Sequence, residues 1–152
     1  MIDRAPRLVV AQSAAAAPIV DAFEKGLAEI VPVIARETVA ESIQVGNPAA
    51  LGWRALAAVR ESKGSAVAVT DPETLEAQYL IASQAGIFVE PAAATSVAAA
   101  IKLKKSGVIG PDEVVVCNLT GHGLKQPDAI RIPDSELQPI APTLNALREY
   151  LR

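Results

Sequence analysis

The hydrophobic and polar positions of the chain form two patterns that follow one another repeatedly. Short apolar runs, of the kind that form buried strands, stand at residues 8–11, 65–69, 87–89 and 113–119. Apolar residues at helical spacing stand at residues 18–27, 49–62, 70–85, 92–106 and 143–151. Strands that alternate with helices in this way predict an α/β fold with a mostly parallel sheet.

Several short signals predict where these elements begin and end. Thr70 and Glu73 have the spacing of a helix capping box, and Gly86 ends the helix that follows. Gly46, Asn47 and Pro48 form a strong turn signal before the next helix. We expect the helix after Thr70 to direct Leu75, Tyr79, Leu80 and Ile81 toward a core. The lysines at 102, 104 and 105 are interpreted as a solvated helix end.

Residues 124–142 are interrupted by four prolines and are predicted to be a surface loop. The run Val114–Cys117 is the clearest buried strand in the sequence, and it leads directly into Thr120-Gly121-His122-Gly123. Ligands of open α/β sheets bind at the carboxyl ends of strands. The threonine hydroxyl and two glycines therefore indicate a binding site, where the glycines would let a ligand approach the backbone. A tight turn with a capping threonine explains the same residues equally well. Gln12-Ser13 and Glu90-Pro91 are two further strand ends with polar residues.

Composition narrows the class of protein. Apolar residues make up 51% and charged residues 20% of the 152 positions, as in a soluble globular domain. Seventeen acidic residues against fourteen basic ones, with only 3% aromatics, argue against nucleic acid as a partner. No apolar stretch is long enough to predict a membrane span or a signal peptide. The single cysteine fits a reducing, cytoplasmic location.

The sequence gives little support for a metal site, a nucleophilic cysteine or a known catalytic motif. His122 is the only histidine and has no neighbours at metal-ligand spacing, so a structural role is favoured and no metal is expected. Cys117 lies mid-strand and is interpreted as a small core residue rather than a nucleophile. The sequence contains no nucleophile elbow, Walker loop or dinucleotide-binding glycine motif.

Five segments, in order, resemble segments of the threonine synthases. Val115 to Lys125 resembles the family's L-T-G-H-G-L-K, and Gly86 to Ala92 resembles G-I-F-x-E-P-A. The others are Leu8 to Pro18, Glu37 to Pro48, and Pro142 to Leu144. Within the first of these, Ala15 departs from the family, which often has glycine there. Threonine synthases are pyridoxal-phosphate enzymes of the tryptophan-synthase-β-like fold. The resemblance implies a three-layer, mostly parallel sheet with flanking helices, incomplete relative to the full fold.

The resemblance covers only the C-terminal part of the family, less than half its usual length. We expect residues 1–152 to form a single α/β domain corresponding to that part. The family's Schiff-base lysine, ring-side asparagine and phosphate cradle lie in the part that has no counterpart here. No catalytic residue is therefore assigned, and the chain is expected to be inactive alone. We expect it to form a homo-oligomer or to associate with a missing N-terminal half.

The family activity converts O-phospho-L-homoserine and water into L-threonine and phosphate, with pyridoxal 5'-phosphate as electron sink. The resemblance implies that Thr120 donates a hydrogen bond to the pyridine nitrogen of the cofactor. It implies cofactor-side roles for Gly121 and Glu90 as well. Ser42, Gly46 and Asn47 are expected to line the substrate side.

Two other functions stay open at this point. The chain could belong to another enzyme of the same fold, a threonine or serine dehydratase, although the Thr120–Lys125 run disfavours this. It could also be a non-catalytic α/β module that binds a small anion or a partner subunit. Release of phosphate rather than ammonia separates the first two, and the absence of a bound-cofactor absorbance would favour the third.

Overall fold

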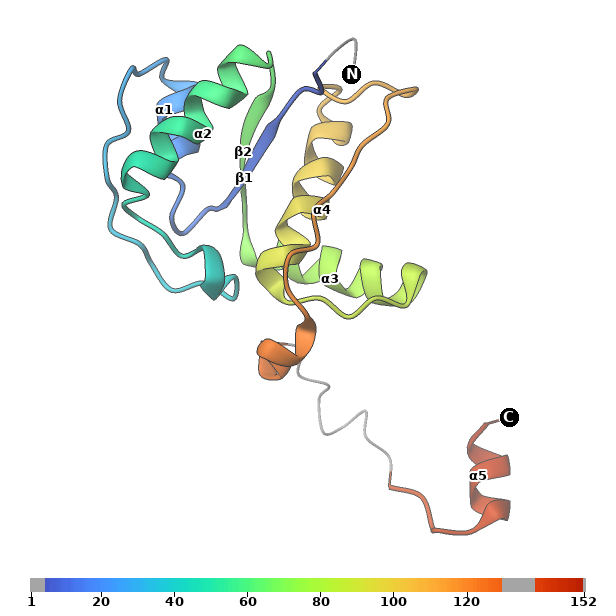
Figure 1. Cartoon of the computed structure of the whole chain (residues 1–152). Helices are drawn as coiled ribbons and strands as arrows, with labels where there is room; N and C mark the ends of the chain where they lie inside the picture. The colour runs from blue at the N-terminus through green and yellow to red at the C-terminus, as the bar shows by residue number, and fades with distance from the viewer. Residues whose placement is uncertain (1–4, 130–138, 152) are drawn as a thin grey trace.

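The central sheet consists of two parallel strands. A computed structural model describes residues 5–129 and 139–151. Strand β1 (Val9–Ser13) pairs with strand β2 (Ser65–Val69) in register, from Val9 opposite Ser65 to Ser13 opposite Val69. Both strands were expected from their apolar runs. Because they are parallel, their carboxyl ends lie at the same edge of the sheet, where the connection to the next helix begins in each case (Figure 1).

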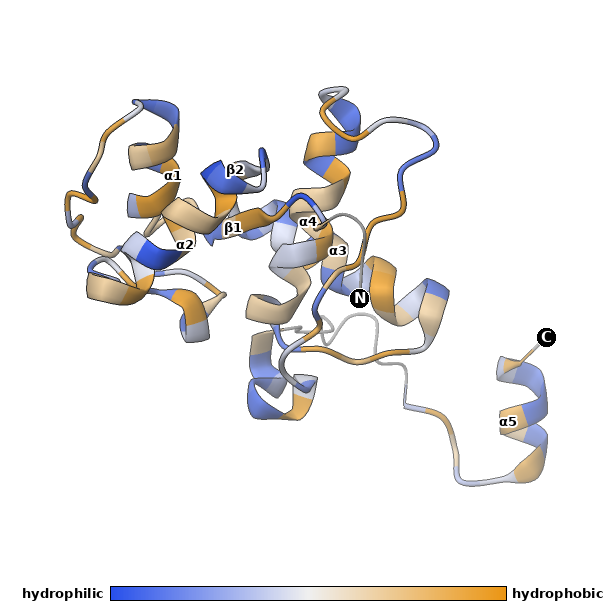
Figure 2. Cartoon of the chain, turned by 45° about the horizontal axis from the view of Figure 1, so that its top comes forward, coloured by the Kyte–Doolittle hydropathy of each residue, from blue (hydrophilic) through white to orange (hydrophobic). Residues whose placement is uncertain are grey.

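Helices cover both faces of this sheet. The four helices that surround it are α1 (Pro18–Glu24), α2 (Ala49–Glu61), α3 (Asp71–Ala85) and α4 (Pro91–Lys105). In two views, α1 and α2 lie on one side of the strands, and α3 and α4 on the other (Figures 1 and 2). Two hydrophobic clusters follow the same division. One joins β2 to α3 and α4, and the other joins α1 to α2. The expected three-layer α/β arrangement is confirmed.

Helix α3 begins and ends where the sequence predicts. The Thr70 hydroxyl accepts a hydrogen bond from the Glu73 N–H, and the Glu73 carboxylate accepts one from the Thr70 N–H at 2.7 Å. Gly86 ends the helix in the left-handed conformation, with φ of 66°. The expected core face was wrong in part, since Tyr79 is 70% exposed and Leu80 also points outward. The buried face follows the helical repeat through Thr74, Ala77, Gln78 and Ile81.

The lysines at the end of α4 are less solvated than expected. Lys102 Nζ donates a hydrogen bond to the Ala68 carbonyl at 2.9 Å and lies 3.1 Å from Glu73 Oε1. Lys102 therefore joins α4 to the end of β2 and to the start of α3. Lys104 Nζ donates to the Gly110 carbonyl at 2.7 Å.

The most strongly predicted buried strand is not one. Residues 113–119 form no strand, and Val114 and Val116 are 93% and 87% exposed. In the described part of the chain, no backbone N–H of residues 114–119 donates a hydrogen bond to a protein group. The segment is held on one side by Ser96 of α4, whose hydroxyl donates to the Asn118 carbonyl at 3.2 Å. Apolar content alone does not make a strand, because the backbone of a strand also needs a neighbouring strand with which to form hydrogen bonds.

The short apolar run at residues 87–89 also forms less strand than expected. Only Val89 pairs, as a single antiparallel bridge with His122. This bridge nevertheless brings the start of α4 next to the turn at residues 120–123. It is the contact from which the candidate site is built.

The remaining elements are short. They are the 3₁₀ helices η1 (Glu41–Ile43), η2 (Gly123–Lys125) and η3 (Pro127–Ala129), and helix α5 (Leu144–Tyr150). The Thr143 hydroxyl caps α5 by accepting from the Ala146 N–H, so the expected last helix is confirmed. Of the expected loop at 124–142, residues 130–138 lie outside the described residues, and η2 and η3 cover part of the rest. None of the described helices is both long and apolar enough to cross a membrane.

Candidate functional site

The carboxyl ends of β1 and β2 are tied together by a buried chain of hydrogen bonds. Ser13 Oγ donates to Thr38 Oγ1 at 2.9 Å, and the Thr38 hydroxyl donates to the Asp71 carboxylate. The other carboxylate oxygen of Asp71 accepts from the Val39 N–H at 3.1 Å. Asp71, the first residue of α3, thus holds Thr38 and Val39 beside the carboxyl ends of the two strands. The polar groups of Ser13, Thr38 and Asp71 therefore bond to one another, and their role is structural.

Gln12 also serves the scaffold. Its Oε1 accepts hydrogen bonds from the N–H groups of Ile19 and Val20 at 2.9 and 3.1 Å. These donors belong to the first turn of α1 and have no partner within their own helix. Both polar residues at this strand end therefore have structural roles. Gln12 caps α1, and Ser13 hydrogen-bonds to Thr38.

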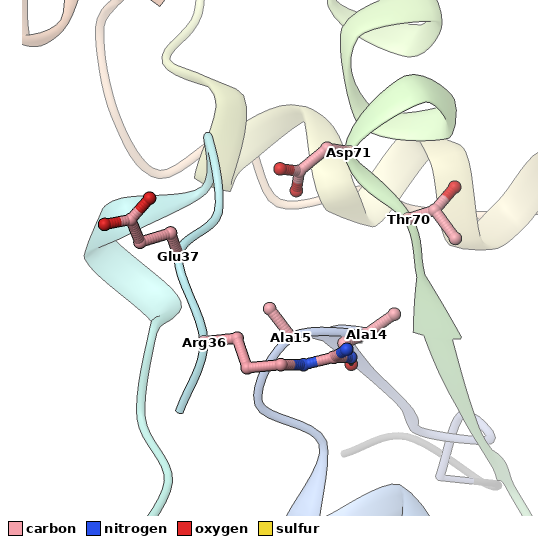
Figure 3. Close-up of a pocket in the computed structure, with 6 residues that line it drawn as sticks. All are labelled: Ala14, Ala15, Arg36, Glu37, Thr70 and Asp71. Atoms are coloured by element: carbon pink, nitrogen blue, oxygen red, sulfur yellow. The ribbon is translucent and has the colours of Figure 1, made fainter. Parts of the chain in front are cut away.

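An open hollow of about 480 Å³ lies beside these strand ends (Figure 3). Its lining residues are Ala14, Ala15, Arg36, Glu37, Thr70 and Asp71. The Arg36 side chain runs beneath the two alanines, and its Nη2 donates to the Ala14 carbonyl at 3.1 Å. None of the site residues expected from the sequence lines this hollow.

The turn at residues 120–123 is fixed against residues 88–90. The Glu90 N–H donates to the Gly121 carbonyl, and the Gly123 N–H donates to the Phe88 carbonyl, each at 3.0 Å. These two bonds flank the Val89–His122 bridge. Residues 88–90 and 121–123, which are far apart in the sequence, therefore form one small ladder.

The two glycines of the turn are required by protein packing. A Cβ on Gly121 would lie 2.1 Å from Glu90 Oε1, and a Cβ on Gly123 would lie 2.6 Å from the Phe88 ring. We expected both glycines to leave room for a ligand. This expectation is corrected: the space where each Cβ would stand is filled by Glu90 at Gly121 and by Phe88 at Gly123. The His122 ring meets Phe88 edge-on with centroids 6.1 Å apart, and its Nδ1 accepts from the Leu124 N–H. These contacts give His122 a structural role.

Thr120 is exposed, as are Leu119 before it and His122 after it. Within the described residues its hydroxyl makes no hydrogen bond, so this group is free to donate to a ligand. Beside it, Glu90 is nearly fully buried, and Lys125 Nζ lies 2.9 Å from its Oε2. A neutral donor next to a balanced ion pair fits an uncharged ring nitrogen as acceptor. The residues present therefore fit one wall of a pyridoxal-phosphate site.

The three expected substrate-side residues lie in the segment before α2. Ser42 is exposed on η1. The Gly46 carbonyl accepts from the Val33 N–H at 2.9 Å, and a Cβ on Gly46 would meet the Val33 carbonyl oxygen. Asn47 Oδ1 accepts from the Ala49 N–H at 3.2 Å. Gly46 and Asn47 thus have structural explanations, while the Ser42 hydroxyl has no hydrogen-bond partner in the described part.

Sequence reasoning missed Gln78, Phe88 and the role of Lys125. Gln78 is fully buried in α3, and its Nε2 donates to the Val89 carbonyl at 2.6 Å. Its Oε1 has no partner among the described residues. Gln78 therefore supports the 88–90 segment from the side opposite the turn. A glutamine on the core face of a predicted helix is the one signal that could have identified it.

Cys117 is a poor nucleophile. It is partly buried, and burial raises the pKa of its thiol above the ordinary value. Its Sγ lies 3.7 Å from the Ser96 carbonyl oxygen. In the described ranges, no group of three His, Cys, Asp or Glu side chains could hold a metal ion.

Solved structures of two other enzymes share the fold over part of their length. Maize serine racemase matches with a TM-score of 0.53 and 21% identity, over 62% of this chain and 27% of that one. A threonine deaminase from T.th. matches with a TM-score of 0.52 and 24% identity, over 64% of this chain and 34% of that one. At these identities the likeness establishes the fold alone.

Several similar sequences carry the name threonine synthase. The protein of Methanocaldococcus jannaschii is 45% identical over 152 residues, which are 100% of this chain and 37% of that protein. That of Methanosarcina acetivorans is 44% identical over 98% of this chain and 36% of its own length. That of Mycobacterium leprae is 40% identical over 99% of this chain and 39% of its own length. The chain thus spans less than two-fifths of these relatives.

A family profile agrees with these relatives. Residues 1–121 match the family described as "Pyridoxal-phosphate dependent enzyme". The match includes Glu90 and Gly121, which pair in the ladder described above, and Thr120, which precedes it. This chain belongs to the family of pyridoxal-phosphate-dependent enzymes.

Proposed function

We propose that this chain is the C-terminal part of a threonine synthase, which converts O-phospho-L-homoserine and water into L-threonine and phosphate. The relatives at 40–45% identity, all named threonine synthase, support this assignment. Because the chain spans 36–39% of their length, the activity is proposed for the complete fold and not for these residues alone. The exposed, unpartnered hydroxyl of Thr120 is the structural observation that carries the proposal.

Thr120 donates a hydrogen bond to the pyridine nitrogen in this proposal. Bound pyridoxal phosphate supplies an electron sink for charge that develops on the substrate. A neutral hydroxyl orients the ring without the strong charge pairing that a carboxylate would give. Gly121 and Glu90 act on the cofactor side by holding Thr120 in place, since the Glu90 N–H and side chain both contact Gly121.

The substrate side is proposed to include Ser42, Gly46 and Asn47. The 3₁₀ helix that carries Ser42 contacts α4, whose N-terminal end carries Glu90. Gln126, which follows the 120–125 turn, donates through Nε2 to the Val39 carbonyl at 3.0 Å. These contacts support a pocket between the segment before α2 and the Thr120 turn. Gly46 and Asn47 would shape its backbone rather than donate side-chain contacts.

The chain is proposed to be a single α/β domain over residues 1–152 that works in the cytoplasm. It would act after association with a part of the fold that supplies the Schiff-base lysine, or as a homo-oligomer of such units.

The test joins residues 1–152 to the preceding part of the M. jannaschii relative and measures the products. With O-phosphohomoserine as substrate, we expect phosphate and threonine in equal amounts. With threonine as substrate, we expect no ammonia above the level of a no-enzyme control. Ammonia release without phosphate release would instead assign the chain to a dehydratase and overturn the proposal.

A further inference from the structure

Glu90 is an unusually placed carboxylate. Its side chain is only 5% exposed, although it stands at the N-terminal end of α4. The carboxylate does not cap that helix, since none of the first N–H groups of α4 donates to it. Its charged partner in the described residues is Lys125, whose own side chain is 61% exposed and whose Nζ lies at 2.9 Å. The lysine therefore reaches in from the surface to balance a buried charge.

The ion pair closes a ring around the turn that carries Thr120. At one end, Gly121 accepts a hydrogen bond from the Glu90 N–H and packs against the Glu90 carboxylate. At the other end, Lys125 contacts the same carboxylate through its ammonium group. Between them, the Lys125 N–H donates to the His122 carbonyl at 3.1 Å. Both ends of residues 121–125 are thus attached to one residue, Glu90.

Only the carboxylate of this ion pair is buried, and its desolvation offsets much of the attraction between the two charges, so the pair is a weak source of net stability. Removal of one partner is costly, because the other charge is left buried. Here the uncompensated charge would be the Glu90 carboxylate, which lies directly against Gly121. Loss of the lysine should therefore displace the turn next to Thr120 more than it unfolds the rest of the chain.

We propose that Lys125 is a positioning residue for Thr120: its ion pair with buried Glu90 holds the 120–125 turn against residues 88–90. The role of Thr120 rests on the proposed function, but the attachment of the turn does not. Lys125 also balances the charge of Glu90, so the wall beside Thr120 carries no net charge. This balance suits a neutral hydroxyl that donates to an uncharged ring nitrogen.

The first experiment uses the 152-residue chain without cofactor and follows amide hydrogen exchange by NMR. In Lys125→Met, we expect the N–H groups of Glu90 and Gly123 to exchange about tenfold faster or more. The Ala14 N–H, which bonds the Val69 carbonyl at 2.7 Å beside the sheet, should be unchanged. The matched control is Lys25→Met, because Lys25 is 64% exposed but pairs with an Asp21 side chain that is 47% exposed. It should leave both turn amides unchanged.

A double variant tests whether the effect of losing Lys125 passes through Glu90. Glu90→Gln combined with Lys125→Met removes both charges and should restore slow exchange at Gly123. Lys125→Arg should keep it slow as well. Uniform acceleration of all amides, or no acceleration in Lys125→Met, would overturn the proposal. Persistent fast exchange in the double variant would also overturn it, because the effect would then not pass through Glu90.

In the joined enzyme, Lys125→Met should lower kcat about tenfold with little change in KM, and Lys125→Arg should recover most of the loss. If the unmodified joined enzyme releases no phosphate, the proposed function fails while the exchange result still decides the role of Lys125. An unchanged kcat in Lys125→Met, together with faster exchange, would contradict the positioning of Thr120.

Discussion

At the scale of single residues, loss of the Thr120 hydroxyl is expected to lower the turnover of the joined enzyme. In the joined enzyme, Thr120→Val removes one hydrogen-bond donor and keeps the shape of the side chain. The loss should cost on the order of 1 kcal/mol, so turnover should fall about fivefold or more. Substrate affinity should change less, because the ring nitrogen matters most when charge develops. Steady-state kinetics measure both, and Thr120→Ser is the control that keeps the donor. Equal turnover in Thr120→Val would identify Thr120 as a turn residue only.

Gly121 is expected to tolerate no side chain. The Cβ in Gly121→Ala would lie 2.1 Å from the buried Glu90 carboxylate, so the turn must shift. We expect a loss of about 1–3 kcal/mol in the free energy of urea unfolding. Gly110→Ala is the matched control, because its nearest neighbour would lie at an ordinary 3.6 Å. Equal stability of the two variants would show that the 120–125 turn is not packed as described.

The sequence predicted some residues of the site but not their contacts. Thr120 and Glu90 were identified as polar residues at predicted strand ends, and their cofactor roles came from a resemblance. In the structure Glu90 pairs with Gly121, the residue after Thr120. The packing roles of Gly121 and Gly123 could not be read from the sequence, since glycine fits both a ligand approach and a crowded backbone. The buried amide of Gln78 was missed because polar residues on a helix are ordinarily assigned to its exposed face.

At the scale of elements, the capping box of α3 gives a pH-dependent prediction. The hydrogen bond from the Thr70 backbone is the main cause that lowers the pKa of Glu73 below its ordinary value of 4.5, with Lys102 adding to it. Because the folded pKa is the lower one, the carboxylate stabilises the fold above pH 4.5 and loses this effect as the pH falls through the folded value.

We expect Glu73→Gln to cost about 0.5–1 kcal/mol at pH 7, since solvent screens a partly exposed carboxylate, and less as the pH falls and the wild-type carboxyl is itself protonated. Urea unfolding at neutral and at acid pH, compared between variant and wild type, measures this difference. Glu76→Gln, an exposed neighbour on the same helix, is the control. A cost that stays the same at both pH values would contradict a contribution from the ionised carboxylate.

The helices were more predictable than the strands, for a physical reason. Helix α3 satisfies its hydrogen bonds internally, so the local signals at Thr70 and Gly86 suffice to define it. A strand needs a partner, and the valines at 114–116 have none in the described part of the chain. The apolar run thus predicted a strand for which the described residues supply no neighbour.

At the scale of the whole molecule, the exposed apolar surface predicts association. A sheet of only two strands, and an unpaired valine-rich segment at residues 114–116 that runs along α4, leave sheet-forming backbone and apolar side chains open (Figure 1). We expect concentration-dependent oligomers of the isolated chain in analytical ultracentrifugation. Val114→Lys combined with Val116→Lys should weaken them without loss of stability, because both side chains are exposed. Val31→Lys, at a 63% exposed site in another segment, should not. A monomer at all concentrations would contradict this expectation.

The measurement that tests the proposed function most directly is phosphate release from O-phosphohomoserine with pyridoxal phosphate present. The 152-residue chain alone should release no phosphate above the buffer rate, because in the proposed function it supplies only one wall of the site. Addition of the separately produced preceding part of the M. jannaschii relative should produce activity that saturates when the two are equimolar. Turnover by the chain alone would contradict the central proposal, and so would an equimolar mixture that assembles, binds the cofactor and still releases no phosphate.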